Sequence, residues 1–199
     1  MKGVHHLFGV VICAALASVA CGDQPDAKSA TGGATLSSGT VASDFSAQDT
    51  NGATLHLSDY LGKDVVLLDF WATWCQPCLE EMPHLRRIYE ANKSRGFVVI
   101  GVSMDGPETV AEVPSFAQRN RLTFPIVLDQ DSHVASVYNP RKSAPLSVLI
   151  DRSGKVVMVH EGYNPGDEQS IAAEIEKALA AAPQSAPPAP ATPQPAPSR

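Results

Sequence analysis

The sequence predicts one three-layer α/β domain built around a mixed β-sheet. Short apolar runs that are typical of buried strands alternate with amphipathic segments that are typical of helices. The last two runs are joined by a turn sequence and followed by a further helical segment, so a hairpin and a helix close the pattern. About 140 residues carry this pattern, which is the size of a domain with one hydrophobic core.

The first half of the pattern begins with Thr54–Leu57, a short edge strand. Val65–Phe70 is an unbroken apolar run that predicts a central strand. A helix is expected to start at the cysteines that follow and to run to about Ser94, with Arg95–Gly96 ending it. Phe97–Ser103 is again continuously apolar, which indicates a strand covered on both faces.

The second half begins with Glu108–Arg121, a segment that predicts a helix. Pro107 and Pro114 leave the first and last residues of this helix undefined. Pro125–Leu128 predicts a short strand and His133–Tyr138 a short helix.

A hairpin and a helix follow. Leu146–Ile150 and Lys155–His160 are strands, and the β-turn sequence Asp151-Arg152-Ser153-Gly154 joins them. Asp167–Ala181 is amphipathic and predicts the last helix. Its apolar residues recur every four positions: Ile171, Ile175 and Leu179.

A Cys-x-x-Cys pair, Cys75 and Cys78, stands between the central strand and its helix, which is the layout of a thiol–disulfide redox site. Two intervening residues bring the thiols close enough to join in a small ring. The helix N-terminus directs unpaired N–H groups and a partial positive charge at the first sulfur. We therefore expect a stabilised thiolate at Cys75, and the thiolate is the attacking species.

Half of a zinc site is the alternative interpretation of this pair. A structural zinc takes four ligands, whereas the other two cysteines, Cys13 and Cys21, lie in the N-terminal leader. The histidines beyond the leader form no His-x₃₋₅-His pair: His56, His84, His133 and His160. The sequence therefore favours redox chemistry and predicts no metal and no cofactor.

Residues 1–20 predict a secretory signal peptide, with a positive start and a short apolar run before small residues. Ser18-Val19-Ala20-Cys21-Gly22 resembles a bacterial lipobox, in which Cys21 becomes the lipidated first residue, although Ser18 stands where that motif usually has Leu. Residues 21–40 would then tether the domain to a membrane. Ordinary cleavage after Ala20, giving a soluble secreted protein, is the alternative.

Residues 183–199 hold seven of the sixteen prolines and predict a disordered or polyproline II tail, which leaves 41–182 as the domain. The net charge is −6 and no basic cluster occurs, so nucleic acid is not expected as a partner.

Several motifs follow one another in a fixed order: FWATWCQPC with EEMP behind it, then VIGVSMD, FPIVLD and SAPLSVLIDRSGKVV. Together they resemble the TlpA/ResA-like branch of the thioredoxin family, the membrane-tethered periplasmic thiol:disulfide oxidoreductases. The resemblance covers roughly Val41–Ala182. It implies a thioredoxin-like fold in which Asp105–Leu128 is the helix and strand that this branch inserts.

The resemblance implies that Cys75 is the nucleophile and Cys78 the resolving cysteine. Pro77 and Gln76 lie between them and would tune the redox potential; the family often has Gly where Gln76 stands. Trp74 would shield the site and offer an aromatic surface to the substrate, the alternative being a simple core residue.

Pro145 matches the cis-proline that faces the disulfide in this family. A cis bond would turn the backbone of Ala144 toward a bound peptide and provide strand-like hydrogen bonds near Cys75. An ordinary proline that opens an edge strand is the alternative.

Two carboxylates are candidates for accepting the proton of Cys78. Asp69 lies inside an apolar strand, where burial should raise its pKa, unless its side chain faces a solvated edge. Glu81 lies three residues after Cys78 on the same helix face and matches a glutamate near the disulfide of ResA-like reductases. Attraction of a carboxylate to the helix N-terminus is its alternative explanation.

The resemblance implies an enzyme that reduces protein disulfides in the periplasm, in cytochrome c maturation or copper-site assembly, with a membrane thiol donor that regenerates it. A DsbA-like oxidase would use the same cysteines in the opposite direction, and a Cu(I)-binding module would hold the metal through both thiolates. A peroxiredoxin would need Thr-x-x-Cys, whereas Ala72 stands three residues before Cys75.

Overall fold

The computed structural model describes residues 36–181. The predicted signal peptide, the tail 183–199 and most of the tether 21–40, including Cys21, lie outside these residues. Across the described range, we find no helix with the length and apolar character that crossing a membrane requires.

A five-stranded mixed sheet forms the middle layer, in the order β5-β4-β3-β6-β7. The central strand β3 (Val65–Trp71) pairs in parallel with β4 (Phe97–Ser103) and antiparallel with β6 (Leu146–Ile150). β5 (Ile126–Leu128) extends the parallel side, and β7 (Val156–Glu161) extends the antiparallel side. The predicted mixed sheet and the thioredoxin-like arrangement are confirmed.

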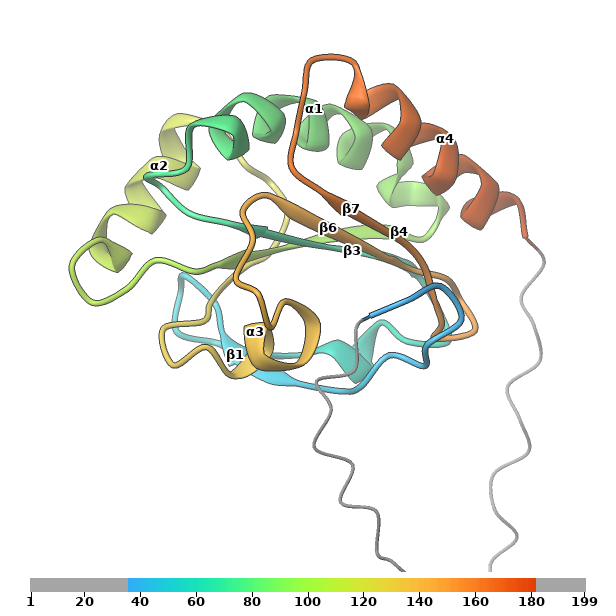
Figure 1. Cartoon of the computed structure of the whole chain (residues 1–199), viewed down its shortest axis with the longest axis horizontal. Coiled ribbons are helices and arrows are strands. Elements are labelled where there is room, and N and C mark those ends of the chain that lie inside the picture. The colour runs from blue at the N-terminus through green and yellow to red at the C-terminus, as the bar shows by residue number, and fades with distance from the viewer. Residues whose placement is uncertain (1–35, 182–199) are drawn as a thin grey trace, which may run out of the picture. The chain divides into compact units, whose positions relative to one another are not determined.

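Helices cover both faces of this sheet. Three of them, α1 (Gln76–Asn92), α2 (Val113–Arg119) and α4 (Asp167–Ala180), lie above it in Figure 1. The short helix α3 (His133–Tyr138) lies on the other face. The sheet and the helices on its two faces thus form the three layers that the sequence predicts.

A short antiparallel ribbon of β1 (Ser46–Gln48) and β2 (Thr54–His56) lies on the same side as α3. β1 is absent from the sequence-based prediction because three mixed residues carry no clear strand pattern, and its pairing partners supply the order instead. The predicted strand 54–57 ends one residue early, where the 3₁₀ turn η1 (Leu57–Asp59) begins.

The predicted helix 108–121 is shorter than expected. It consists of the 3₁₀ turn η3 (Val110–Glu112) followed by α2, which has Pro114 in its first turn. A proline is tolerated there because that N–H has no partner inside the helix. At the end of α1, the 3₁₀ turn η2 (Lys93–Arg95) leads to Gly96 at φ 80°, which confirms the predicted stop.

The N-terminal part of the described chain pairs with both edges of the sheet. Gly39 N–H donates to the carbonyl of Val156 at 2.7 Å, and Val156 N–H donates to the carbonyl of Thr40 at 2.8 Å. On the opposite edge, Asp49 forms a bridge with Val127 of β5. Both edge strands are therefore partly paired by the same segment.

Two apolar cores lie on the two sides of the sheet, and β3 contributes to both. Val66 and Leu68 belong to the core on the α3 side, whereas Val65 and Leu67 belong to the core beneath α1 and α4. Successive side chains of a strand point to opposite faces. Asp69 therefore points to the face that α1 and α4 cover.

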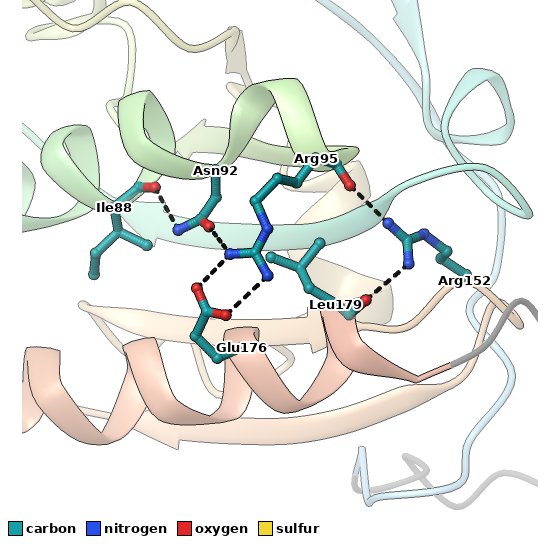
Figure 2. A network of polar contacts seen from close by, with 6 residues as sticks. All are labelled: Ile88, Asn92, Arg95, Arg152, Glu176 and Leu179. Atoms are coloured by element: carbon teal, nitrogen blue, oxygen red, sulfur yellow. Dashed lines mark hydrogen bonds and ion pairs between the residues drawn. The ribbon is translucent and has the colours of Figure 1, made fainter.

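A polar network fixes the end of α1 that lies away from the cysteines (Figure 2). Arg95 donates to both carboxylate oxygens of Glu176 in α4, at 2.6 and 2.9 Å, and to Asn92 Oδ1 at 2.6 Å. Arg152, from the turn between β6 and β7, donates to the carbonyls of Leu179 at 3.1 Å and Arg95 at 2.7 Å. The turn thus caps the carbonyl of Leu179 near the end of α4 and binds the carbonyl of Arg95 just after α1.

Candidate redox site

The two cysteines lie where β3 gives way to α1. Cys75 is the N-cap of α1, with φ −90° and ψ 98°, and its Sγ accepts a hydrogen bond from the N–H of Cys78 at 3.3 Å. A disulfide joins the two residues, whose Cα atoms are 5.3 Å apart. Cys75 is 5% exposed and Cys78 is 1% exposed. Cys75 is therefore the more accessible of the two.

The two tryptophans of this segment differ sharply in their surroundings. Trp74, directly before the nucleophile candidate, is 62% exposed, which excludes the core-residue interpretation. Trp71 is fully buried and packs on Phe116 of α2, with ring centroids 5.1 Å apart. An exposed aromatic ring beside a buried disulfide is available for contact with a partner.

The Ala144–Pro145 peptide bond is cis, as the family resemblance implies. Pro145 directly precedes β6, and the first residue of β6, Leu146, pairs with Phe70 of β3. This register brings Pro145 to the end of β3 from which the Cys75 loop departs. Gln76 is exposed and donates to Glu80 at 3.1 Å.

Asn139 organises the loop before Pro145. It is buried, its Nδ2 donates to the carbonyl of Ser143 at 2.7 Å, and its Oδ1 accepts from the N–H of Ser143 at 2.9 Å. Asn139 is not among the residues predicted for the site, although the dipeptide Asn139-Pro140 is a turn signal that could have indicated it.

Asp69 and Glu81 are both buried on the α1 side of the sheet, each 1% exposed. The hydroxyl of Ser147 in β6 donates to Asp69 Oδ1 at 3.4 Å. Both carboxylate oxygens of Glu81 lack a hydrogen-bond partner among the described residues. Asp69 thus does not face a solvated edge, and the burial of Glu81 goes beyond what attraction to a helix end requires.

Burial is the main cause of large pKa shifts in this pair. Loss of hydration raises the pKa of Asp69 to about 7, against a smaller opposing effect of the Ser147 hydrogen bond. Loss of hydration, followed by the charges of Asp69 and Asp167, raises the pKa of Glu81 to about 9. Because a charge on either carboxylate disfavours a charge on the other, the pair retains at least one proton at neutral pH.

Asp105, just beyond β4, is fully buried and holds the loop that leads to Cys75. Thr73 N–H lies 3.2 and 3.1 Å from the two carboxylate oxygens, and the Thr73 hydroxyl donates to Oδ1. The hydroxyl of Ser103 donates to Oδ2 at 2.9 Å. The motif VIGVSMD contains Asp105 but gives no sign of this role, because the partner Thr73 lies 32 residues away.

Two pockets of the described domain have none of the predicted site residues in their lining. One, of about 260 Å³, lies beside the loop before Pro145 and includes Asn139 and Leu146 in its lining. Another, of about 510 Å³, lies between the β1–β2 ribbon and α3, and no predicted site residue lines it. Across residues 36–181, no three His, Cys, Asp or Glu side chains are grouped so that they could hold a metal ion.

Comparisons with known proteins agree with this geometry. Residues 38–159 match the model of the AhpC/TSA family. The thiol-disulfide oxidoreductase ResA of Geobacillus kaustophilus is 40% identical over 124 residues, which are 62% of this chain and 69% of that protein.

Solved structures give the same picture. A Chlorobium tepidum protein provisionally identified as the thiol:disulfide interchange protein DsbE superposes with a TM-score of 0.67 and 34% identity, over 72% of this chain and 99% of that one. The exposed lipoprotein thioredoxin Etrx1 of Streptococcus pneumoniae superposes with a TM-score of 0.58 and is 27% identical, over 68% of this chain and 99% of that one.

Proposed function

The chain belongs to the AhpC/TSA family and to its ResA-like thiol-disulfide oxidoreductases, and we propose that it reduces protein disulfides by exchange at Cys75 and Cys78. Family membership confirms the resemblance that the motifs indicated. The observation that supports the proposal best is the Cys75–Cys78 disulfide at the N-terminus of α1, next to the exposed Trp74.

In the first step, the thiolate of reduced Cys75 attacks one sulfur of a substrate disulfide. A new S–S bond forms between Cys75 and the substrate, and the other substrate sulfur leaves as a thiolate that takes up a proton. The position of Cys75 at a helix N-terminus, with the N–H of Cys78 at 3.3 Å, stabilises the attacking thiolate.

In the second step, Cys78 loses its proton and attacks Cys75. The Cys75–Cys78 disulfide forms, and the substrate departs as a second thiol carrying the electron pair of the broken bond. The substrate is thereby reduced by two electrons and the enzyme is oxidised by two. Cys78 is buried, so its proton needs an acceptor inside the protein.

We assign that acceptor role to Asp69. A general base works best when its pKa is near the operating pH, and burial raises the pKa of Asp69 to about 7. Burial, together with the charges of Asp69 and Asp167, also raises the pKa of Glu81, so each of the two carboxylates disfavours ionisation of the other. Glu81 thereby adjusts the acidity of Asp69 through their mutual repulsion.

Trp74, Gln76, Pro77, Ala144 and Pro145 form the proposed substrate surface. Trp74 offers apolar area next to Cys75, and the family resemblance assigns to the backbone of Ala144 the pairing with an extended peptide. The substrate class that this surface suits is an unfolded or extended polypeptide that contains a disulfide. Apocytochrome c and copper-site assembly proteins are the candidates that the ResA-like resemblance suggests.

We further propose that the protein works in the periplasm as a lipoprotein anchored through Cys21 and is regenerated by a membrane thiol donor. The features of residues 1–21 support this placement. A structural relative described as an exposed lipoprotein thioredoxin supports it as well.

The decisive experiment is the redox potential of the purified protein, equilibrated with glutathione or dithiothreitol buffers, together with insulin-disulfide reduction. A reductase should have a potential near that of thioredoxin, about −270 mV, rather than that of DsbA, about −120 mV. A value at the oxidising end, with no insulin reduction, would reverse the direction of the proposed reaction.

A further inference from the structure

We propose that Asp105 is a positioning residue for the nucleophile, acting through Thr73. This inference rests on the proposed thiol–disulfide exchange at Cys75 and adds a residue that controls it. Asp105 lies on the segment that continues β4, far from Cys75 in the sequence, yet its carboxylate holds the loop that carries Cys75.

All four contacts of the Asp105 carboxylate come from hydrogen-bond donors. Thr73 contributes its N–H, shared between both oxygens, and its hydroxyl; Ser103 contributes its hydroxyl at 2.9 Å. Ser103 Oγ also accepts the N–H of Asp105 at 3.2 Å, which fixes the carboxylate's own position. A carboxylate accepts in several directions at once and suits this site, whereas a neutral amide would place a donor among donors.

The contacts of Asp105 extend to the nucleophile through the chain itself. Trp71 at the end of β3 accepts a hydrogen bond from the N–H of Met104 at 2.8 Å, and Cys75 N–H donates to the carbonyl of Ala72 at 3.1 Å. Thr73 is the next point of attachment, and Cys75 follows it by two residues. The end of β4 therefore holds the loop at Trp71 and at Thr73, two residues before the N-cap of α1.

Cys75 must be placed accurately because attack on a disulfide depends on the alignment of three sulfur atoms. Displacing a reacting atom by about 1 Å can lower a rate on the order of 100-fold. The hydrogen bonds of the Asp105 carboxylate go to Thr73 and Ser103 and not to a sulfur of Cys75 or Cys78, so its effect is on the placement of the sulfurs. We expect Asp105→Asn to slow the attack by Cys75 about 10- to 100-fold.

The test measures three properties of each reduced, full-length variant. These are the rate of reaction with a small disulfide and with insulin, the equilibrium potential in glutathione buffers, and the thiolate absorbance of Cys75 across pH. Asp105→Asn should lower both rates and shift the potential. Thr73→Val, which removes one hydroxyl donor, should lower the rates about three- to tenfold, and Thr73→Ser should regain them.

The control is Arg152→Ala, which removes hydrogen bonds at the opposite end of α1. This variant should unfold at a lower urea concentration. Its rates of reaction with disulfides, its equilibrium potential and the pH dependence of its Cys75 thiolate absorbance should equal those of the wild type. If a folded Asp105→Asn protein keeps all three wild-type properties, the proposal is wrong. If Asp105→Asn does not fold, Thr73→Val decides: wild-type rates in that variant overturn the proposal. Failure of the wild type to reduce insulin would instead refute the proposed function. The rates at which Asp105→Asn and the wild type react with the small disulfide would still test the role of Asp105.

Discussion

Replacing Asp69 with Asn should make the folded protein more stable and the enzyme slower. Well below pH 3.8, Asp69 is protonated in both the folded and the unfolded chain, so the substitution removes no charge. As the pH rises, the unfolded chain ionises near the ordinary value of 3.8, whereas the folded chain keeps its proton up to about pH 7. Wild-type stability is therefore lost as the pH rises through this window, and the Asn variant avoids that loss.

The size of the effect follows from the pKa shift. A rise from 3.8 to about 7 is three units, and each unit corresponds to about 1.4 kcal/mol, so the variant should gain at most about 4 kcal/mol above pH 7. This is an upper value because Glu81 shares the same buried environment. The proton of Cys78 loses its acceptor at the same time, which should slow resolution by at most ~10²–10⁴-fold.

Urea denaturation of the oxidised protein at pH 4, 6 and 8 measures the gain in stability. Stopped-flow release of substrate from a preformed mixed disulfide across pH 6–8 measures the resolution rate. Glu81→Gln is the matched comparison. A stability difference that does not grow with pH would refute the burial argument, and unchanged release rates would assign the proton to Glu81 or to water. If Glu81→Gln alone slows release, Glu81 is the acceptor.

Three further predictions concern other parts of the chain. Cys75→Ser should abolish insulin reduction, while Cys78→Ser should trap mixed disulfides through Cys75; trapping by the first variant instead would reverse the two roles. Arg152→Ala should lower the free energy of unfolding by roughly 1–3 kcal/mol, measured by urea denaturation, because carbonyls of Arg95, Leu179 and Lys63 lose a donor; unchanged stability would show that water replaces it. Cys21→Ser should move the protein from the membrane fraction to the soluble periplasm or leave it as uncleaved precursor, and an intact mass showing an unmodified Cys21 in the wild type would refute the lipid anchor.

The sequence predicted the strands that are buried on both faces and the turns that have strong local signals. β3 and β4 were recognisable because each is a continuous apolar run, and Gly96 marked the end of η2. β1 was missed because its order comes from pairing with β2 and from the bridge at Asp49, neither of which leaves a pattern in three residues.

In the candidate site, too, some residues are recognisable from the local sequence and others are not. Cys75, Cys78 and the buried Asp69 could be identified from local context, since each stands out against its neighbours. Asp105 could not be identified in this way, because an aspartate after a strand is common. Its role depends on hydrogen bonds from Thr73, which follows the neighbouring strand β3. Long-range partners of polar residues are fixed by the fold and leave no mark in the order of residues.

The pairing of the N-terminal segment with both edges of the sheet has a consequence for how the protein behaves in a crowded compartment. An open edge strand is a template on which another chain can add, and it promotes aggregation. Gly39 and Thr40 occupy part of the β7 edge, and Asp49 occupies part of the β5 edge. The covered edges leave unfolded chains few places to add indiscriminately, which suits the proposed pairing of an extended client with the backbone beside Pro145.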